Sequence, residues 1–336
     1  MNKIVECVPN FSEGRSEQTI NAIAESIRSV RGVKLLSVEP DKDYNRCVVT
    51  FVGEPEGVKE AAYRATKTAA ELIDMRQHKG EHPRLGATDV VPFIPISGVT
   101  MENCVEIANE FGQRVAETLH IPIYLYEEAA QTIERKNLAN IRKGEYEKLQ
   151  EKLNDPAWQP DFGSPIFNAK SGATVTGARV FLIAYNVNLN TNNKDIAHEI
   201  ALRIRESGRT IKEPNGHSIK IPGSLKAVKA MGVFLDRFNI AQVSINLTNF
   251  MITPPHVAFE EVKKEAQKLG LNTTGSEVVG LIPKEALLMT GRFYLKKFDR
   301  PSNKNNEELV DTAIECLGLS QLESFDPKKK IIEYMI

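Results

Sequence analysis

The sequence predicts an α/β protein built from two ferredoxin-like units, each with the element order β-α-β-β-α-β. Three observations support this prediction. The chain has 336 residues, about twice the length of an average domain. Apolar residues up to position 96 follow strand and helix spacing in that order. The same order of elements recurs after residue 180, which places the boundary between the units near residue 178.

The first unit begins with a strand over residues 3–9 that has one apolar face. The next helix stops before Gly32, a residue typical of helix ends. The other elements expected here are a helix over 20–30, strands over 33–38 and 47–52, a helix over 57–75 and a strand over 90–96. Pro92 and Pro95 lack a backbone N–H group, so the last strand is expected at a sheet edge or on an irregular path.

A long connection separates the two repeats. It contains an expected helix over 103–118, an expected strand over 121–126 and a charged helix over 139–153 with a mostly solvated face. Residues 155–178 are rich in Pro, Gly, Asn and Ser and predict a long loop. A loop of this length inside a compact protein is more often functional than idle.

The second unit repeats the pattern of the first. Its expected elements are a strand over 180–187, a helix over 197–204, strands over 227–235 and 242–250, a helix over 255–269 and a strand over 272–279. A polar stretch over 299–306 leads to a final helix over 307–317, and the Lys328–Lys330 run predicts a solvated tail. The expected divisions are residues 1–178, residues 179–325 and a tail over 326–336.

Composition and charge exclude several classes of function. The 43 Lys and Arg residues balance 44 Asp and Glu residues for a net charge of -1, which argues against nucleic-acid binding and a polybasic membrane anchor. Four cysteines stand far apart without a C-x-x-C pair, which favours a reducing compartment and gives no zinc framework. The N-terminus lacks a secretion signal, and no apolar run approaches the roughly 18 residues of a membrane span. We therefore expect a cytoplasmic protein.

The densest polar segment spans residues 76–89 and contains His78 and His82. Three interpretations compete. The spacing of the histidines resembles two metal ligands on one helix face, but Gly80 and Pro83 break such a helix and no third ligand is evident. A solvated polar loop is the second interpretation. The third is a general base or acid, since a free imidazole with a pKa near 6.5 is mostly neutral at pH 7.

His82 is the stronger candidate for proton transfer. Pro83 stiffens the backbone beside it, and Glu81 or Asp89 is near enough in sequence to orient the ring through its second nitrogen. His78 is expected at a helix end, where the partial negative charge favours the imidazolium form.

A second polar segment spans residues 161–179. Gly172 and Gly177 have the spacing of a phosphate loop, but Ala178 and Arg179 stand where Lys and Ser or Thr are required. A strand also follows where a helix is needed, so a nucleotide site of that type is rejected. The Gly, Ser and Asn content would expose backbone groups to a polar heterocycle, with aromatic side chains as flat walls. The alternative is an interdomain linker.

Other candidates carry less information. Trp158 either packs or stacks on a ligand, and His256 begins a helix, where its ring most simply acts as a cap. Cys7 and Cys47 lie on expected strands and are most simply buried small hydrophobes.

Several of these motifs together resemble the glutamate formimidoyltransferase (formiminotransferase) family. They are VECVPNFSEG at 5–14, GEHPRLGA at 80–87, PFIP at 92–95, DFG at 161–163 and GATVTGAR at 172–179. The similarity extends over nearly the whole chain, to about residue 325, and the motifs stand in the family's order.

The resemblance implies transfer of a formimino group between 5-formimino-tetrahydrofolate and L-glutamate, with N-formimino-L-glutamate on the other side, in histidine breakdown. It implies two α/β subdomains with a groove between them for tetrahydrofolate, the co-substrate, and a homodimer without metal. The family's catalytic histidine falls on His82. An acidic residue, usually Asp in the family, corresponds to Glu39. The family's folate-binding loop falls on Gly163, Ser164, Pro165, Ile166, Phe167, Asn168, Ala169, Lys170, Ser171 and Gly172.

Vertebrate relatives in this family carry a following cyclodeaminase domain. This chain ends too soon for one, so the resemblance predicts the single-domain form, with the second activity absent or on a separate protein.

The implied chemistry fits the residues. The amine of glutamate must lose a proton to attack the amidine-like carbon, and the folate nitrogen must gain a proton to leave. One imidazole can serve both steps, which is worth roughly 10²–10⁴ in rate. Both substrates carry carboxylates, so four cations are candidate counter-charges, namely Arg46, Lys79, Arg84 and Arg179.

Two alternatives stay open. Transfer of a formyl group from 5-formyl-tetrahydrofolate differs by O for NH, and no residue in the sequence distinguishes the two donors. Two ferredoxin-like units also resemble ACT-type modules that bind amino acids without catalysis, but such a module needs no cluster of histidine and cations.

Overall fold

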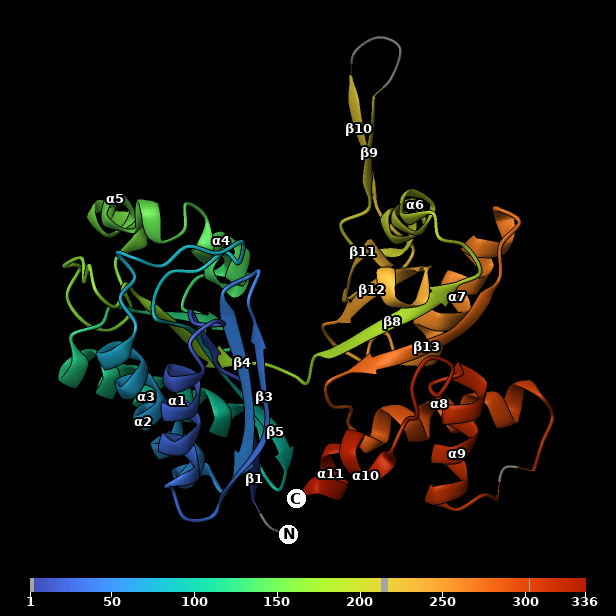
Figure 1. Cartoon of the computed structure of the whole chain (residues 1–336), viewed down its shortest axis with the longest axis horizontal. Helices are drawn as coiled ribbons and strands as arrows, with labels where there is room; N and C mark the ends of the chain where they lie inside the picture. The colour runs from blue at the N-terminus through green and yellow to red at the C-terminus, as the bar shows by residue number, and fades with distance from the viewer. Residues whose placement is uncertain (1–2, 213–216, 302) are drawn as a thin grey trace. The chain divides into compact units, whose positions relative to one another are not determined.

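The computed structural model describes residues 3–212, 217–301 and 303–336. The chain divides into two compact units, Met1–Val180 and Phe181–Ile336 (Figure 1). The sequence prediction places this division after residue 178. Each unit combines a main sheet with several helices.

The first unit contains a seven-stranded sheet (Figure 1). Its strands are β1 (Ile4–Cys7), β2 (Asn10–Phe11), β3 (Val33–Asp41), β4 (Arg46–Gly53), β5 (Thr88–Ser97), β6 (Ile123–Glu127) and β7 (Thr174–Ala178). β3, β4, the short strands β1 and β2, and then β5 lie side by side as antiparallel neighbours, which is the ferredoxin-like order. β7 and β6 extend this sheet in parallel beyond β5. The predicted order of elements is confirmed; β6 corresponds to the strand expected over 121–126, and β7 was not predicted.

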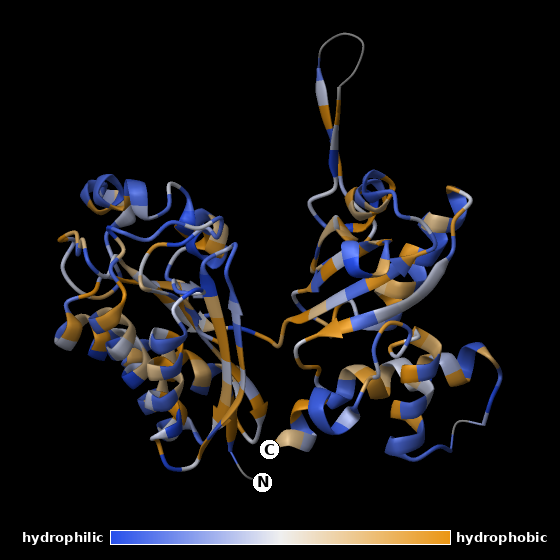
Figure 2. Ribbon diagram, viewed as in Figure 1, coloured by the Kyte–Doolittle hydropathy of each residue, from blue (hydrophilic) through white to orange (hydrophobic). Residues whose placement is uncertain are grey.

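Three amphipathic helices share one core with this sheet, namely α1 (Glu17–Arg28), α2 (Pro55–Leu72) and α3 (Met101–Leu119). Local sequence sets where they begin. Ser16 accepts a hydrogen bond from a first-turn amide at 3.3 Å, and Thr100 forms a capping box with Asn103. Alternate strand residues such as Phe11 and Cys47 enter the same core. Figure 2 shows hydrophobic colour along these strands and helices.

The opposite face of the sheet carries a second, smaller core. Tyr124 and Val90 belong to it, whereas their neighbours Ile123 and Val91 belong to the first core, as strand alternation requires. Short helices close this second core, namely η1 (Ile133–Lys136), α4 (Leu138–Arg142), η2 (Tyr146–Lys148), α5 (Leu149–Asn154) and η3 (Pro156–Trp158).

The connection between the repeats differs from its prediction. A single charged helix over 139–153 is wrong, because Gly144 and Glu145 take positive φ angles of 89° and 55° and split it. A continuous loop over 155–178 is wrong as well, because its last residues form β7 between β5 and β6.

The strand that contains Pro92 lies inside the sheet and not at its edge. Its pairing is irregular, with register shifts opposite both β1 and β2. The Pro92 carbonyl accepts a hydrogen bond from the Val8 amide at 3.4 Å, where the predicted first strand breaks into two. A missing N–H is therefore tolerated at an interruption of the neighbouring strand.

The second unit has a four-stranded antiparallel sheet in the order β11, β12, β8, β13, which is again ferredoxin-like. Its elements are β8 (Ile183–Leu189), α6 (Lys194–Ile204), β11 (Val228–Leu235), η4 (Asp236–Phe238), β12 (Ile240–Leu247), α7 (Pro255–Lys268) and β13 (Thr273–Val279). The repeat of element order is therefore confirmed in the structure.

Several elements of this unit are absent from the prediction. They are the projecting hairpin of β9 (Arg209–Lys212) and β10 (Ser218–Ile221), and the helix α8 (Lys284–Lys297) (Figure 1). The predicted last helix corresponds to α9 (Asn306–Leu317). The polar stretch predicted over 299–306 includes residue 302, which lies outside the described residues.

A solvated tail over 326–336 is wrong. Two short helices form there, α10 (Pro327–Lys330) and α11 (Ile332–Met335). Ile331 and Ile332 are fully buried, and Ile331 forms a β-bridge with Ile282. The three lysines therefore precede two buried isoleucines that hold the C-terminal segment against the second unit.

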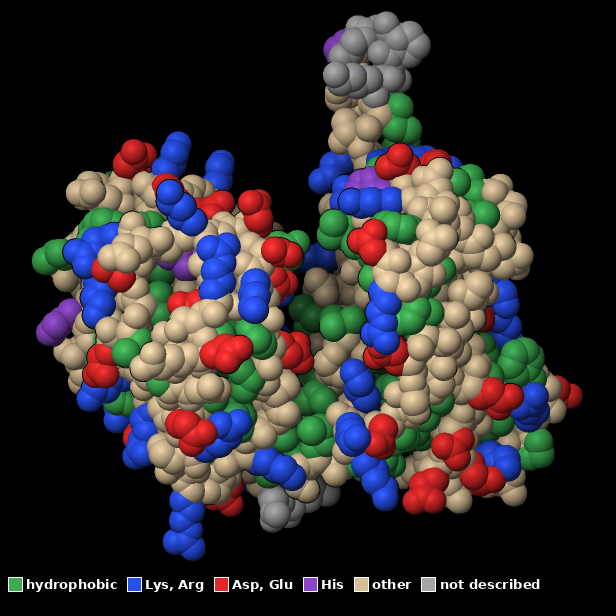
Figure 3. Space-filling model, viewed as in Figure 1, with side chains coloured by type: hydrophobic (Ala, Val, Ile, Leu, Met, Phe, Trp, Pro, Cys, Tyr) green, Lys and Arg blue, Asp and Glu red, His purple; other side chains and the backbone are tan. Residues whose placement is uncertain are grey.

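Charged side chains of both signs are mixed over the visible surface (Figure 3), in line with the net charge of -1. Among the helices of the described ranges, none has the length and apolarity needed to cross a bilayer.

Candidate functional site

The two polar segments singled out in the sequence meet in the first unit. Gly86 and Gly172 form an antiparallel β-bridge. The Ala173 amide donates to the Leu85 carbonyl at 3.1 Å, and the Ala87 amide donates to the Ser171 carbonyl at 2.9 Å. A β-carbon on Gly172, whose φ is +69°, would lie 2.1 Å from the Leu85 carbonyl oxygen. Only glycine permits this approach.

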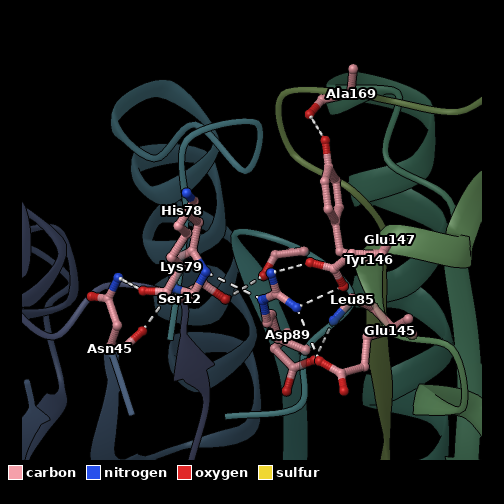
Figure 4. A network of polar contacts seen from close by, with 12 residues as sticks. Ser12, Asn45, His78, Lys79, Leu85, Asp89, Glu145, Tyr146, Glu147 and Ala169 are labelled. Atoms are coloured by element: carbon pink, nitrogen blue, oxygen red, sulfur yellow. Dashed lines mark hydrogen bonds and ion pairs between the residues drawn. The ribbon is translucent and has the colours of Figure 1, made fainter. Parts of the chain in front are cut away.

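The first strand region and the β3–β4 turn also hold the His82 loop. Ser12 donates through Oγ to the Gly86 carbonyl at 2.8 Å. Asn45, which has a positive φ of 48°, accepts a hydrogen bond from the Gly14 amide at 3.0 Å and donates to the Lys79 carbonyl at 2.9 Å. Figure 4 shows Ser12 and Asn45 beside Lys79. Segments far apart in sequence therefore fix both ends of this loop.

His82 is buried, with 8% of its surface exposed. Burial lowers its pKa to about 4; the Asp89 carboxylate opposes this shift, whereas the positive charges of Arg142, Arg46 and Arg84 reinforce it. Within the described residues neither ring nitrogen has a hydrogen-bond partner. The ring is therefore neutral at pH 7, with a nitrogen lone pair free to accept a proton.

Asp89 has a different role from the one expected. Its side chain is 1% exposed, one carboxylate oxygen accepts a hydrogen bond from the Leu85 amide at 2.9 Å, and the other pairs with Arg142. Glu81 is exposed. Neither acid bonds to the His82 ring, so Asp89 fixes the loop backbone and the position of Arg142.

His78 is neutral, and the expected imidazolium is wrong. Its Nδ1 accepts a hydrogen bond from Arg84 Nε at 3.2 Å, so Nε2 carries the proton and donates to the Asn45 carbonyl at 2.8 Å. Burial and the Arg84 charge both lower its pKa. No group of three metal-ligating side chains occurs in the part of the chain that the structure describes.

Arg84 is not a free counter-charge for a substrate. Its side chain is 6% exposed and forms ion pairs with Glu145 at 3.0 Å and Glu147 at 2.6 Å. Together with the bond to His78, these contacts occupy all three guanidinium nitrogens. These contacts do not support the predicted role of Arg84 in carboxylate binding.

Arg46 differs from Arg84 in its contacts. It is half-buried at the start of β4, and its charge acts on His82. Its buried Nε has no partner, and no acid among the described residues pairs with its guanidinium. Alternation places its side chain on the sheet face opposite Cys47, away from the first core.

The other predicted binding residues lie apart from His82 in their contacts. Lys79 has an exposed side chain. Arg179 follows β7 and donates to the Val180 carbonyl at 3.0 Å. Glu39 is exposed on β3, opposite Val48. None of the three is among the main charges that shift the pKa of His82.

The loop over 163–172 has a free half and an anchored half. Residues 163–166 are exposed, including 73% of Ile166. In the other half, the ring of Phe167 lies 5.5 Å from that of Tyr146, and Lys170 Nζ donates to the Glu71 carbonyl at 2.7 Å. Asn168 Oδ1 accepts from the Ser171 amide at 3.0 Å. The exposed residues 163–166 are therefore held in place by the anchored residues 167–172.

Sequence reasoning missed Arg142, Glu145, Tyr146 and Glu147, which were assigned to a solvated helix. Figure 4 shows Glu145, Tyr146 and Glu147 gathered beside Leu85. The available signal was Gly144, a helix breaker in the middle of a charged run. Trp158, left open in the sequence, packs against the second core, with Lys152 4.5 Å above its ring.

A buried, neutral imidazole with free nitrogens among arginines is the kind of site that enzymes use for proton transfer. The formiminotransferase domain, N-terminal subdomain, matches residues 4–179, and the formiminotransferase domain matches residues 184–336. The chain therefore belongs to the formiminotransferase family, and the predicted resemblance is confirmed.

Individual relatives agree with this assignment. A formimidoyltransferase-cyclodeaminase of Dictyostelium discoideum is 51% identical and covers 100% of this chain and 61% of its own length. Glutamate formimidoyltransferases of Streptococcus pyogenes serotype M1 and Thermoplasma acidophilum are 46% and 47% identical; the matches cover 89% and 87% of this chain and 95% and 92% of the relatives. The chain thus spans about three fifths of the length of the Dictyostelium relative.

Proposed function

We propose that the chain is a glutamate formimidoyltransferase, which moves a formimino group between N-formimino-L-glutamate and tetrahydrofolate in histidine breakdown. The observation that carries this proposal is the backbone pairing of the His82 loop with the loop over 163–172, beside a buried neutral imidazole. Two sequence-distant motifs of one family are thus paired in one unit, which supports a single site there.

His82 would act as base and then as acid. Tetrahydrofolate N5 attacks the formimino carbon, and His82 accepts the proton that N5 loses as the new C–N bond forms. The bond between that carbon and the glutamate nitrogen then breaks, and His82 returns the proton to the leaving amine. Atoms and charges balance without another reactant. The reverse reaction uses the same steps in the opposite order.

An imidazole with a pKa of about 4 is a weak base; burial is the main cause, and the positive charges of nearby arginines add to it. Arg46 would pair with a substrate carboxylate, which cancels part of the positive charge that lowers the pKa of His82. The pKa then rises towards the value that suits proton transfer near neutral pH. The exposed residues 163–166 would contact the folate. A homodimer and a cytoplasmic location stay predictions.

The test is a direct assay with both possible donors. The wild-type protein is incubated with L-glutamate and either 5-formimino- or 5-formyl-tetrahydrofolate, and the glutamate product is identified by mass spectrometry. We expect formimino transfer. Activity with the formyl donor alone would replace the proposal with formyl transfer, and inactivity with both donors would overturn it.

A second measurement tests the role of His82. His82→Ala should lower kcat by at least about 10² while tetrahydrofolate still binds by isothermal titration. The acid limb of kcat, which reports the substrate complex, should lie at higher pH than that of kcat/KM. Full activity of His82→Ala would remove this residue from the mechanism.

A further inference from the structure

We propose that Glu145 and Glu147 are positioning residues for His82, and that they act through Arg84. This inference rests on the proposed function, because it takes His82 as the group that transfers the proton. The segment over 144–147 lies in the stretch that sequence reasoning assigned to a solvated helix. It contacts both halves of the candidate site.

The first contact is with the His82 loop. Glu147 holds Arg84 with two parallel bonds of 2.9 and 2.6 Å, and Glu145 adds a third at 3.0 Å. The Arg84 carbonyl accepts a hydrogen bond from the Tyr146 amide at 2.8 Å. A bidentate pair fixes orientation as well as distance. Arg84 is therefore held on both its side chain and its backbone, two residues after His82.

The second contact is with the loop over 163–172. Tyr146 donates through its hydroxyl to the Ala169 carbonyl at 2.5 Å, and its ring tilts 43° against that of Phe167. Figure 4 shows Tyr146 extending to Ala169 while Glu145 and Glu147 lie beside Leu85. Three consecutive residues thus link the base of the proposed folate loop to the loop that carries His82.

The backbone of Glu145 gives independent support. Its φ of 55° and ψ of −162° fall in a region that glycine occupies almost alone. It follows Gly144, which has a φ of 89°. Stability alone would favour a second glycine here. A glutamate in this conformation is explained by its carboxylate, which reaches Arg84.

The arrangement predicts an effect on turnover more than on binding. His82 has no bonding partner among the described residues, so its position depends on the backbone on either side. Asn45 fixes the side before His82 through Lys79. Segment 144–147 fixes the side after it through Arg84. Loosening the second support would misplace the imidazole while Arg46 and residues 163–166 stay available to substrates.

The experiment compares Glu147→Gln with Glu151→Gln. Glu151 lies in α5, is exposed, and forms no ion pair with a described residue, so it is a matched control. Glu147→Gln should lower kcat roughly 10- to 100-fold, because small displacements of a catalytic group are costly, and leave KM for N-formimino-L-glutamate nearly unchanged. Glu151→Gln should change neither constant. Equal kcat in both variants would overturn the proposal.

Glu145→Gly separates positioning from folding. The substitution relieves the backbone and removes the carboxylate, so the unfolding temperature should stay level or rise while kcat falls. A merely structural role predicts that kcat follows stability. Unchanged kcat in Glu145→Gly would count against the proposal.

Amide hydrogen exchange gives a readout that needs no turnover. Exchange of residues 80–86 should be faster in Glu147→Gln than in wild type and unchanged in Glu151→Gln. Unchanged exchange in both variants would contradict the positioning role of Glu147, even if the enzyme is active. Inactivity of the wild type with both donors, with faster exchange in Glu147→Gln, would instead remove only the proposed function.

Discussion

One buried histidine in each unit allows a direct comparison. His82 and His256 are 8% and 7% exposed, and burial lowers the pKa of each to about 4. His256 stacks on Phe293 at 4.4 Å between ring centres, and its Nδ1 lies 3.2 Å from the Thr290 hydroxyl oxygen. The ring of His82 has no such partner among the described residues, and the charges of Asp89 and three arginines act on it. Burial and pKa therefore do not distinguish the two histidines, whereas the hydrogen bonding and the charges around each ring do.

The additions to the two ferredoxin-like units differ in the same way. The second unit adds α8 to α11, which extend its apolar packing. The first unit adds β6, β7 and, between them in the chain, a series of short helices, and this series supplies Arg142, Glu145 and Glu147 to the His82 loop. The shared fold gives a scaffold, and the segment that follows β5 in the first unit adds charged contacts to the His82 loop.

The largest expected effect is on the free energy of unfolding, when a buried acidic side chain in each unit is replaced by its amide. Asp89→Asn should lower the free energy of unfolding by about 3–5 kcal/mol, since it leaves the Arg142 charge partly buried without its partner. Glu265→Gln is the counterpart, because its partners Arg203 and Lys268 are 26% and 53% exposed and can be hydrated. Its cost should be about 1 kcal/mol or less. Urea unfolding measures both, and equal costs would contradict the comparison.

The next largest effect is the difference in stability loss between alanine substitutions at two glycines with similar φ angles. Gly172 and Gly270 have φ of +69° and +73°, but a β-carbon would meet the Leu85 carbonyl at 2.1 Å in the first case and nothing within 4 Å in the second. Gly270→Ala should cost about 1 kcal/mol. Gly172→Ala should cost about 2–3 kcal/mol and also reduce turnover. A Gly172→Ala protein with wild-type turnover would separate the site from this close approach.

Acid should weaken both units through their histidines. Each folded-state pKa of about 4 lies below the ordinary 6.5. The unfolded chain therefore binds more protons between these values, and the contribution to stability, present above pH 6.5, is lost as pH falls through about 4. Between pH 7 and pH 5 each histidine should account for about 1–2 kcal/mol.

The control for this effect is substitution of each histidine in turn. His256→Gln and His82→Gln should each flatten the dependence of unfolding free energy on pH, and only His82→Gln should abolish turnover. A pH dependence that neither substitution changes would assign it to other groups.

The smallest expected effect is at the surface of the second unit. Arg237 and Glu323 form an ion pair at 2.7 Å, with side chains 76% and 64% exposed. Arg237→Ala should change the free energy of unfolding by less than about 0.5 kcal/mol and leave kcat unchanged. A larger loss would show that exposed pairs in this unit matter as much as the buried Asp89 pair of the first.

Periodicity predicted most strands and helices because burial dictates it locally. Cys47 and Val49, for example, alternate into the core. The roles of individual charged side chains depend on contacts between residues far apart in sequence, which local patterns do not reveal. Arg84 looked free in sequence because Glu145 and Glu147 are about sixty residues away. His78 looked cationic because its acceptor role depends on Arg84. The lysine run at 328–330 suggested a solvated segment, although Ile331 beside it is buried.

The family motifs predicted which loops matter, and the structure shows how they are joined. Gly86 and Gly172 belonged to two separate sequence motifs, but their bridge requires the register of β5 against β7. That register is set by the whole sheet. Spacing alone cannot reveal it.

The position of β7 has a kinetic consequence. It is made after β5 and β6 yet lies between them, so it must enter a gap in a sheet whose flanking strands are already synthesised. Non-local parallel pairing is slow to form. Since Gly172 lies just before this strand and pairs with Gly86, the His82 loop and the loop over 163–172 reach their final arrangement only when this insertion is complete. On the ribosome, the pairing of these two loops would be one of the last events in maturation of the first unit, because β7 is its last strand to be synthesised.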